Sequence, residues 1–383
     1  MSSLLDKIPP HFLRELYKIR DYLSPYTKRV YLVGGCVRDL LMGEELSDFD
    51  IEIYDIEPKL FDKLMQEFGA KGVGKSFFVY KYKSFDLALA RKERKIAKGH
   101  RGFEVEVAND EKEASRRRDF TMNAIMINLF TGELLDLWRG VEDIKRKLIR
   151  IIDEERFKED SLRVLRAMQF SARFGFKIER KSCLVMREID LLDITKDRIF
   201  WEFEKMFFGK YLHFGLYYLS ALGIMQKLLN LSISRDIFFK SAFELAKNRE
   251  KFDKRYYQFY FLYILSKNLN IGFDKIASLI NAPNTYLKML KKQVPLPKEV
   301  SDLFLLKLSL NYPIKEWLGN YFDKVRERAL KLGIYEKRYE SRVKALDLLK
   351  EGFKGKELGE ELMRRQIKEI EEIAYELHSK DSL

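Results

Sequence analysis

The chain has 383 residues, 46% of them hydrophobic, and a formal net charge of +13 at pH 7. This composition excludes intrinsic disorder, and at roughly 150 residues per domain the length predicts two or three domains. No apolar run reaches the ~20 residues that cross a membrane, and the N-terminus lacks a signal-peptide pattern, so we expect a cytoplasmic protein. Cys36 and Cys183 lie far apart without C-x-x-C spacing, so the cysteines imply neither a disulfide framework nor a zinc knuckle.

The positive excess favours a polyanion, either nucleic acid or an acidic membrane surface, over a neutral metabolite. A generally basic protein without such a partner is the alternative.

The first 140 residues alternate between helical and strand patterns, which predicts a mixed sheet with few helices. Residues 91–101 are expected to form a polar loop, and 83–84 the turn of a hairpin. Helices are expected at 12–23, 36–42 and 59–68, and strands at 30–33, 49–54, 77–82, 85–90, 103–107, 124–130 and 134–137.

Strand patterns nearly vanish beyond residue 141, where long segments have the 3.6-residue period of helices. We therefore predict an α+β fold with an N-terminal head and a mostly helical remainder. The expected divisions are a head at 1–140, a neck at 141–210, a body at 211–300 and a tail at 301–383. A charged terminal helix is expected at 356–378, either solvated or facing RNA.

Residues 69–76 match the P-loop spacing G-x-x-x-x-G-K-[ST]. A P-loop works because a strand enters it and a helix leaves it, so that backbone N–H groups and a helix N-terminus meet at the phosphates. Here a helical pattern enters and a strand pattern leaves. We therefore reject an ATPase site and expect a flexible helix-to-strand connection.

A strand, a glycine pair and a helix follow one another at residues 30–42, and Asp48 and Asp50 come shortly afterwards. Gly34 and Gly35 would let a triphosphate approach the backbone at the start of the helix. Alternate residues of a strand share a face, so the two carboxylates should project together and could share divalent cations. Alternatively, Asp48 caps the strand and Asp50 is solvated.

The run GGCVRDLLMG followed by SDFDIEI resembles motif A of the class II tRNA nucleotidyltransferase and bacterial poly(A) polymerase family, within the polymerase-β-like superfamily. RRDFTMNA resembles motif B and LDLWRGVED resembles motif C. EDSLR followed by LRA resembles motif D, and DRI with Glu202 and Lys205 resembles motif E. Together these blocks cover roughly residues 25–210.

The resemblance implies a site built from several blocks. Arg118 and Asp119 would address the ribose of the incoming nucleotide, with Asn123 beside them, whereas Asp160 and Arg163 would select its base in place of a nucleic-acid template. Read alone, the first of these pairs belongs to a solvated charge run and the second is a surface ion pair. The implied catalytic residues are Asp48, Asp50 and Asp86, with Asp48 and Asp50 as metal ligands. The implied nucleotide-binding residues are Gly34, Gly35, Arg38, Arg118, Asp119, Asn123, Asp160, Arg163 and Arg166.

Asp86 is implied only because superfamily members place a carboxylate on a neighbouring strand, and a solvated side chain is its alternative. The chain also departs from the family pattern. Gln169 stands where many members carry arginine, and Trp138-Arg139 stand where Phe-Gly is frequent. These departures bear on nucleotide choice and on the hinge.

The resemblance implies a template-independent nucleotidyltransferase that uses two Mg²⁺ ions, ATP and CTP to extend the tRNA acceptor end, with no membrane partner. By the same resemblance, the long charged connection at 91–116, with Gly99 and Gly102, suits the mobile loop that A addition needs. We therefore expect addition of the terminal A, as the end of CCA addition or as the sole reaction beside a separate CC-adding enzyme. The alternatives are a poly(A) polymerase, a CC-adding enzyme and a non-catalytic RNA-binding protein.

RNA is expected to bind the helical remainder, mainly through its phosphates. Lys291-Lys292 and Lys254-Arg255-Tyr256-Tyr257 are the candidate contacts, although a place in the core is the favoured interpretation of the two tyrosines.

Overall fold

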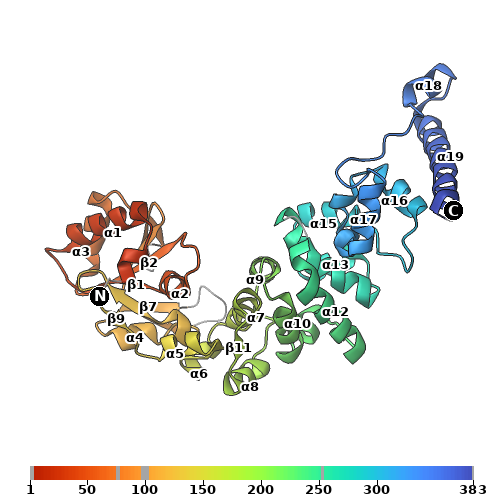
Figure 1. The fold of residues 1–383 in the computed structure, drawn as a ribbon. Coiled ribbons are helices and arrows are strands. Elements are labelled where there is room, and N and C mark those ends of the chain that lie inside the picture. Colours follow the sequence, from red (N-terminus) through yellow and green to blue (C-terminus); the bar gives the residue numbers. More distant parts are fainter. Residues whose placement is uncertain (1–3, 75–77, 96–102, 252–253, 382–383) are drawn as a thin grey trace. The chain divides into compact units, whose positions relative to one another are not determined.

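The computed structural model describes residues 4–74, 78–95, 103–251 and 254–381. The chain separates into two units, Met1–Ser232 and Ile233–Leu383 (Figure 1). The first unit combines a mixed sheet with helices, and the second is helical. The predicted α+β class is therefore confirmed, whereas the finer division into neck, body and tail stays a prediction.

A seven-stranded sheet lies at the centre of the head, with strand order β3-β4-β5-β2-β1-β8-β9. Its strands are β1 (Val30–Val33), β2 (Phe49–Ile53), β3 (Lys71–Gly74), β4 (Val79–Tyr82), β5 (Phe85–Leu89), β8 (Met126–Asn128) and β9 (Leu134–Leu135). Neighbouring strands are antiparallel except β2 and β5, which are parallel. That parallel pair sets Asp50 directly beside Asp86.

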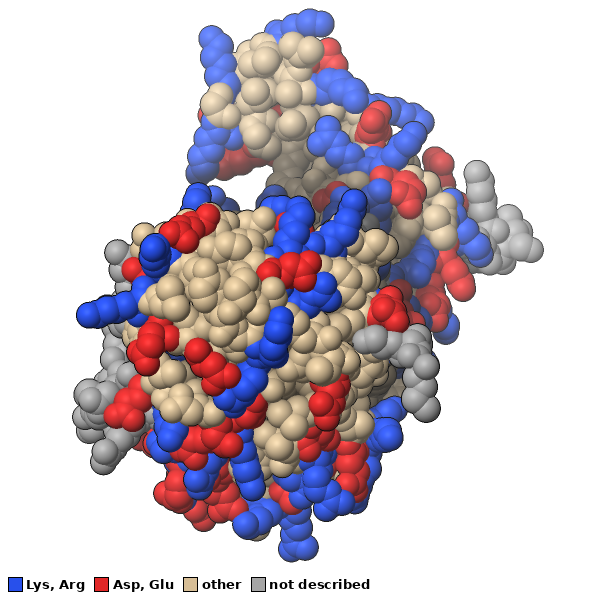
Figure 2. Space-filling model, turned by 90° about the vertical axis from the view of Figure 1, so that its left-hand side faces the viewer, with Lys and Arg blue, Asp and Glu red and all other residues tan. Residues whose placement is uncertain are grey.

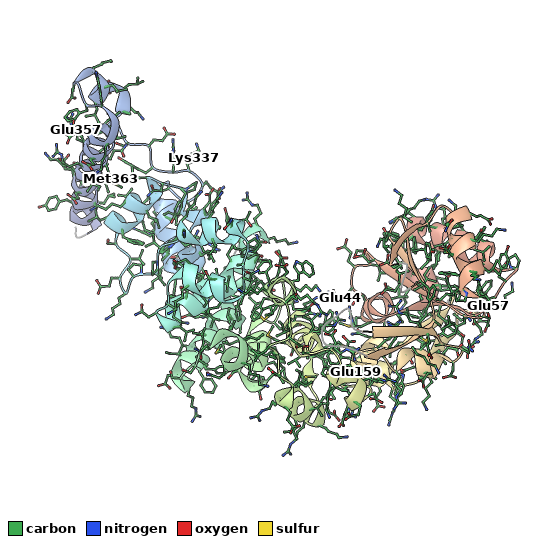
Figure 3. The ribbon with its side chains drawn as sticks, turned by 180° about the vertical axis from the view of Figure 1, so that it is seen from behind. Glu44, Glu57, Glu159, Lys337, Glu357 and Met363 are labelled. Atoms are coloured by element: carbon green, nitrogen blue, oxygen red, sulfur yellow. The ribbon has the colours of Figure 1, made fainter. Side chains whose placement is uncertain are left out.

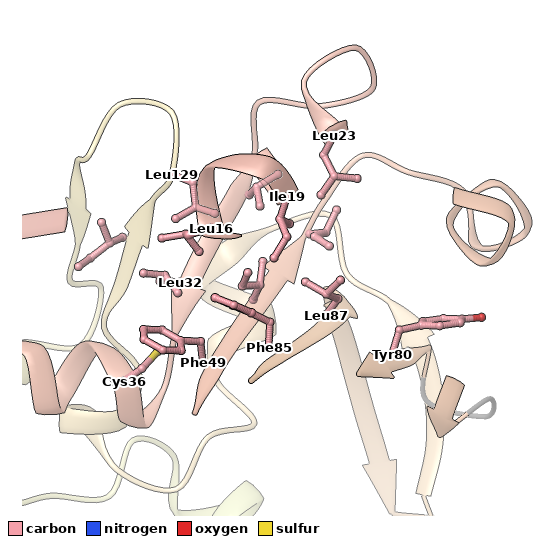
Figure 4. Packing of buried hydrophobic residues seen from close by; sticks show 14 of the residues in the cluster. Leu16, Ile19, Leu23, Leu32, Cys36, Phe49, Tyr80, Phe85, Leu87 and Leu129 are labelled. Atoms are coloured by element: carbon pink, nitrogen blue, oxygen red, sulfur yellow. The ribbon is translucent and has the colours of Figure 1, made fainter. Parts of the chain in front are cut away.

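The two faces of the sheet differ in character. One face is packed under three helices, whose apolar side chains meet those of the strands (Figure 4). These helices are α1 (Pro10–Leu23), α2 (Gly35–Met42) and α3 (Pro58–Glu67). Phe49, Ile51 and Ile53 of β2 belong to this core. Because successive side chains of a strand alternate, Asp50 and Glu52 lie on the opposite face, which is where the polar site forms.

The prediction of a loop at residues 91–101 is wrong for the first half of this segment. Arg91–Lys95 forms strand β6, which pairs antiparallel with β7 (Phe103–Val107) in a separate two-stranded sheet. Every residue of β6 is charged, so no apolar alternation marks it as a strand. The strand forms because its backbone pairs with β7, whose residues do alternate between apolar and charged. Residues 96–102, including Gly99 and Gly102, lie outside the described part of the chain.

The flexible connection expected at 69–76 is also wrong in part, because Lys71–Gly74 is strand β3 at the edge of the sheet, paired with β4. Lys75 and Ser76 lie outside the described residues. The rejection of a P-loop is consistent with the element order, since helix α3 enters this segment and β3 follows it.

Beyond residue 141 the described strands are two-residue β10 (Leu148–Ile149) and β11 (Lys177–Ile178), which pair in parallel. The remaining α-helices of the first unit are α4 (Glu111–Ser115), α5 (Gly140–Lys145), α6 (Glu154–Lys158), α7 (Leu162–Phe174), α8 (Arg180–Glu188), α9 (Lys196–Phe207), α10 (Leu212–Ala221) and α11 (Ile224–Leu229). Helix α7 packs against α9 and α10. Side chains from motifs that are distant in the sequence can therefore meet at α7.

The second unit is built from helices around its own core. These are α12 (Arg235–Asn248), α13 (Tyr257–Leu269), α14 (Phe273–Leu279), α15 (Asn284–Lys291), α16 (Asp302–Ser309), α17 (Asp323–Lys331), α18 (Ala345–Lys350) and α19 (Gly355–Asp381). Trp317 is fully buried in a cluster with Leu305 and Ile370. The terminal helix predicted at 356–378 is confirmed as α19.

Charge is mixed over the surface in Figure 2, where lysine and arginine side chains are interspersed with aspartate and glutamate. The positive excess therefore does not form one continuous basic patch on that face. In the described part of the chain, every helix is too short or too polar to cross a membrane.

Candidate active site

The turn between β1 and α2 requires glycine. Gly34 has φ +78° and ψ −136°, a conformation open essentially to glycine alone. A Cβ atom at this position would lie 2.9 Å from Nη1 of Arg118 and 3.1 Å from Oδ2 of Asp50. Gly34 therefore brings the backbone close to one cation and one carboxylate, and Gly35 starts α2 directly afterwards.

Asp48 and Asp50 line the same cavity as this glycine turn. Asp48 is exposed just before β2, and Asp50 is the second residue of the strand. The surrounding protein raises the pKa of Asp50, Arg118 opposes that effect, and Asp86 on the neighbouring strand adds to it. A carboxylate held next to another carboxylate is a favourable position for a bound cation.

Asp86 is not among the residues that line the cavity. Its Oδ1 lies 3.0 Å from Nζ of Lys81 on β4, and its side chain is 39% exposed. The register sets it beside Asp50, but its visible partner is a lysine. A catalytic role for Asp86 stays a prediction.

Glu52 is a residue that the sequence did not single out. Its side chain is 2% exposed, and Oε1 accepts a hydrogen bond from Nη2 of Arg117 at 2.9 Å. Arg118 Nη2 lies 3.8 Å from Oε2. Tyr54 donates its hydroxyl to the same carboxylate. Glu52 thus anchors both arginines of the RRDF segment, and the signal for it was its place on the same strand face as Asp50.

Asp119 is the buried centre of a second network. It accepts hydrogen bonds from Nδ2 of Asn123 at 2.8 Å and from Nε of Arg166 at 2.6 Å. Asn123 in turn accepts from Nη1 of Arg38 at 2.6 Å. Burial acts to raise the pKa of Asp119, but Arg166 and Asn123 outweigh it and hold the pKa below its ordinary value. Asp119 is therefore ionised at neutral pH.

The expected base-selecting pair comes from the start of α7. Asp160 is bound by Nη2 of Arg198 on α9 at 3.2 Å. Arg163 donates to the main-chain carbonyls of Arg156 at 2.9 Å and Arg117 at 2.6 Å. The described contacts thus tie Asp160 and Arg163 to other elements, and a mutual surface ion pair, the simpler alternative, is not what holds them.

One cavity of about 620 Å³ collects these groups. It contains every predicted site residue except Asp86, and its cations outnumber its carboxylates. Its lining is Gly34, Gly35, Arg38, Asp48, Asp50, Arg117, Arg118, Asp119, Asn123, Asp160, Leu162, Arg163, Arg166, Gln169, Phe170, Arg173, Arg198 and Lys205. Such a surplus of positive charge suits a substrate that carries several phosphates.

A second cavity of about 740 Å³ lies beside the α2–β2 connection and the start of α1. It is lined by residues 40–47 together with Lys7, Pro9, His11 and Phe12. The clustered carboxylates and arginines line the cavity of about 620 Å³. We therefore assign the chemistry to that cavity, although the second cavity is larger.

The donor set of the site fits a hard divalent cation. Two aspartate carboxylates supply the oxygen ligands that Mg²⁺ prefers, and phosphate oxygens and water complete such sites. Among the described residues, no three His, Cys, Asp or Glu side chains are grouped to hold an ion. Phosphate oxygens of a bound substrate would therefore complete the coordination of a cation held by Asp48 and Asp50.

Two family models match the first unit. One, described as the Poly A polymerase head domain, covers residues 30–150. The other, described as a probable RNA and SrmB-binding site of polymerase A, covers residues 175–232. The first spans the glycine turn, Asp48, Asp50 and the RRDF segment.

Curated relatives match the same part of the chain. The CCA-adding enzyme of Lactococcus lactis subsp. cremoris is 36% identical over 225 residues, covering 55% of this chain and 54% of that protein. The Multifunctional CCA protein of Stenotrophomonas maltophilia is 38% identical over 188 residues, covering 46% and 45%. The chain thus spans about half the length of the curated relatives it matches.

Solved structures extend the likeness to the whole chain. The Bacillus stearothermophilus CCA-adding enzyme in complex with CTP has a TM-score of 0.68 at 23% identity, with 98% of both chains covered. The Thermotoga maritima CCA-adding enzyme complexed with tRNA has a TM-score of 0.66 at 20% identity, covering 99% of this chain and 100% of that chain. At these identities the likeness establishes the fold.

Proposed function

We propose that this chain belongs to the family of class II tRNA nucleotidyltransferases and bacterial poly(A) polymerases, and that it adds nucleotides to the 3′ end of tRNA without a nucleic-acid template. One observation carries the proposal. Two aspartates, a glycine turn at a helix start, and the Asp119 and Asp160 networks line a single basic cavity.

The reaction is an in-line attack of the RNA 3′-hydroxyl oxygen on the α-phosphorus of a nucleoside triphosphate. A new P–O bond forms, the bond to the β-phosphate oxygen breaks, and pyrophosphate leaves. The backbone N–H groups at Gly34 and Gly35 can approach the phosphates, because neither residue has a side chain in the way. Asp48 and Asp50 would hold two divalent cations, which neutralise the triphosphate and activate the attacking hydroxyl when bound.

Selection of the nucleotide falls to the two networks. Asp119, kept ionised by Arg166, can accept a hydrogen bond from a ribose 2′-hydroxyl, which a deoxyribose lacks. Contacts to two main-chain carbonyls hold the guanidinium of Arg163 at the cavity wall. A guanidinium offers N–H donors that match acceptor atoms on the edge of a base. Asp160 supplies the matching acceptor.

We infer that the terminal A is within its repertoire. The support is the charged segment at 91–116, which contains the β6–β7 pair and α4. A tRNA substrate would also make the cytoplasm its site of action.

The tRNA would contact the helical second unit. Lys254 and Arg255 are exposed, as are Lys291 and Lys292, whereas Tyr256 and Tyr257 are only half-buried. These cations could bind phosphates in a manner independent of tRNA identity.

Separate Asp48→Ala and Asp50→Ala variants test the assignment. Each should reduce labelled nucleotide incorporation into tRNA by at least about a hundredfold, because metal-ion stabilisation of this step is worth several kcal/mol. Asp236→Ala, at an exposed position on α12, is the matched control and should stay at the wild-type rate. Activity within tenfold of wild type in either site variant would contradict the assignment.

Product length separates the alternatives. The family model is described as a poly(A) polymerase head, and a poly(A) polymerase would add long A tails to unrelated RNAs. The proposed enzyme should stop by itself at a completed tRNA end. A chain that binds tRNA but incorporates no nucleotide with Mg²⁺ would be a non-catalytic RNA-binding protein.

A further inference from the structure

The cavity lining includes Gln169 and Arg173, which have no part in the networks described above. Gln169 and Arg173 lie on α7, one and two turns beyond Arg166, and both line the cavity. Residues three or four positions apart share one helix face, so they continue the wall that Arg163 and Arg166 begin.

The geometry points to a nucleotide subsite in which Arg173 binds a phosphate and Gln169 accepts a hydrogen bond from a hydroxyl or amino group of the same nucleotide unit. This inference rests on the proposed function of the cavity.

The amide oxygen of Gln169 has no hydrogen-bond partner in the described part of the chain. The residue is 1% exposed. Buried amides in proteins are almost always bonded, because water can no longer satisfy them. The cavity is where a partner can come from, and an orphaned carbonyl oxygen calls for an N–H or O–H donor.

Arg173 is a cation without a carboxylate partner in the described part of the chain. Its guanidinium packs against the Phe174 ring at 4.9 Å. Arg38, a nearby cation of the cavity, is already bound by Asp39 at 2.7 Å and by Asn123. Burial and the charge of Arg38 lower the pKa of Arg173, which Asp39 and Glu202 only partly offset. A phosphate would relieve both penalties.

The spacing along α7 limits which group can reach this subsite. At 1.5 Å per residue, Gln169 lies about 9 Å and Arg173 about 15 Å beyond Arg163 along the axis. Both distances exceed the length of a hydrogen bond. A base bound at Arg163 therefore cannot also contact Gln169 and Arg173, and a different group must occupy the subsite. Two sources share the required chemistry, the sugar-triphosphate of the incoming nucleotide and the last nucleotide of the RNA.

The test compares Arg173→Met with Arg173→Lys, and Gln169→Met with wild type. Nucleotide is varied at saturating tRNA, tRNA is varied at saturating nucleotide, and equilibrium binding of ATP and of tRNA is measured on the full chain. Arg173→Met should raise one KM and the matching Kd by about tenfold or more, since a charge-assisted hydrogen bond is lost. Arg173→Lys should recover most of that loss, and Gln169→Met should weaken the same ligand by about fivefold.

The two sources give different results. A change in the KM for nucleotide identifies the incoming triphosphate, and a change in the KM for tRNA identifies the RNA end. Arg180→Met, an exposed arginine on α8, is the control and should change neither. Both KM values and both Kd values within twofold of wild type in Arg173→Met, or a thermal destabilisation with unchanged Kd, would overturn the subsite. If the wild-type chain incorporates no nucleotide at all, the proposed function is wrong. The Kd values for ATP and tRNA would still test the subsite in that case.

Discussion

Replacing Glu52 by glutamine should destabilise the head, because it removes the anion that two arginines share. The Glu52 side chain is 2% exposed, and those of Arg117 and Arg118 are 19% and 14% exposed. Removing one partner of a buried pair costs about 3–5 kcal/mol. Since both arginines keep some contact with the cavity, we expect the lower limit, about 3 kcal/mol.

This loss should be visible as a lower melting temperature. For a domain of 150–250 residues, 1 kcal/mol corresponds to about 2–4 °C, so Glu52→Gln should lower the Tm of the head by about 6–12 °C. Circular dichroism and urea unfolding measure the change. Glu57→Gln is the control, because Glu57 is exposed at the start of α3 (Figure 3) and should stay within about 1 °C of wild type.

The difference between the two proteins should also depend on pH. Burial acts to raise the pKa of Glu52, but Arg118 and Arg117 outweigh it and hold the pKa below its ordinary value. A depressed folded-state pKa contributes stability above the unfolded pKa of about 4.3, and that contribution is lost as pH falls through the folded value. The difference in stability between wild type and Glu52→Gln should be constant from about pH 6 to about pH 8, and it should become smaller below about pH 4. Equal stability of the two proteins at pH 7 would refute the anchoring role of Glu52.

Three further outcomes follow from the site and the fold. Asp119→Asn should reduce the preference for ATP over dATP by at least about tenfold in incorporation assays, and an unchanged ratio would contradict the ribose assignment. Gly140→Ala should lower the Tm by several degrees, because a Cβ would meet the carbonyl oxygen of Thr121 and lie 2.8 Å from Ile125. Gly359→Ala, with open space around it, is the control. Affinity for tRNA should fall by about tenfold or more between 50 and 200 mM salt, and equal binding at both would argue against phosphate contacts.

Much of the cavity could be predicted from sequence, because short motifs with fixed chemistry supply it. The glycine turn, Asp48 and Asp50 are neighbours in the chain, so strand alternation was enough to bring them together. Asp119, Asp160 and Arg166 were implied by family resemblance. Their gathering in one cavity depends on packing of α7 beside the head, which no local pattern specifies.

The missed features depend on contacts between distant segments. Strand β6 has no apolar residue and exists through its pairing with β7. The sequence did not single out Glu52, because its partners Arg117 and Arg118 lie 65 residues or more along the chain. Asp160 pairs with Arg198, 38 residues along the chain, because α9 packs against α7. Burial and long-range pairing decide these cases, and neither is visible in local periodicity.

The measurement that tests the central claim most directly offers three tRNAs to the wild-type chain, ending before CCA, after C and after CC. Each is incubated with Mg²⁺ and labelled CTP or ATP alone. We expect the CC-ended tRNA to take up a single AMP and then stop, and CMP incorporation into the shorter tRNAs would show the full CCA reaction. Uptake of CMP without AMP on the CC-ended tRNA would make the chain a CC-adding enzyme. No incorporation into any of the three would contradict the account.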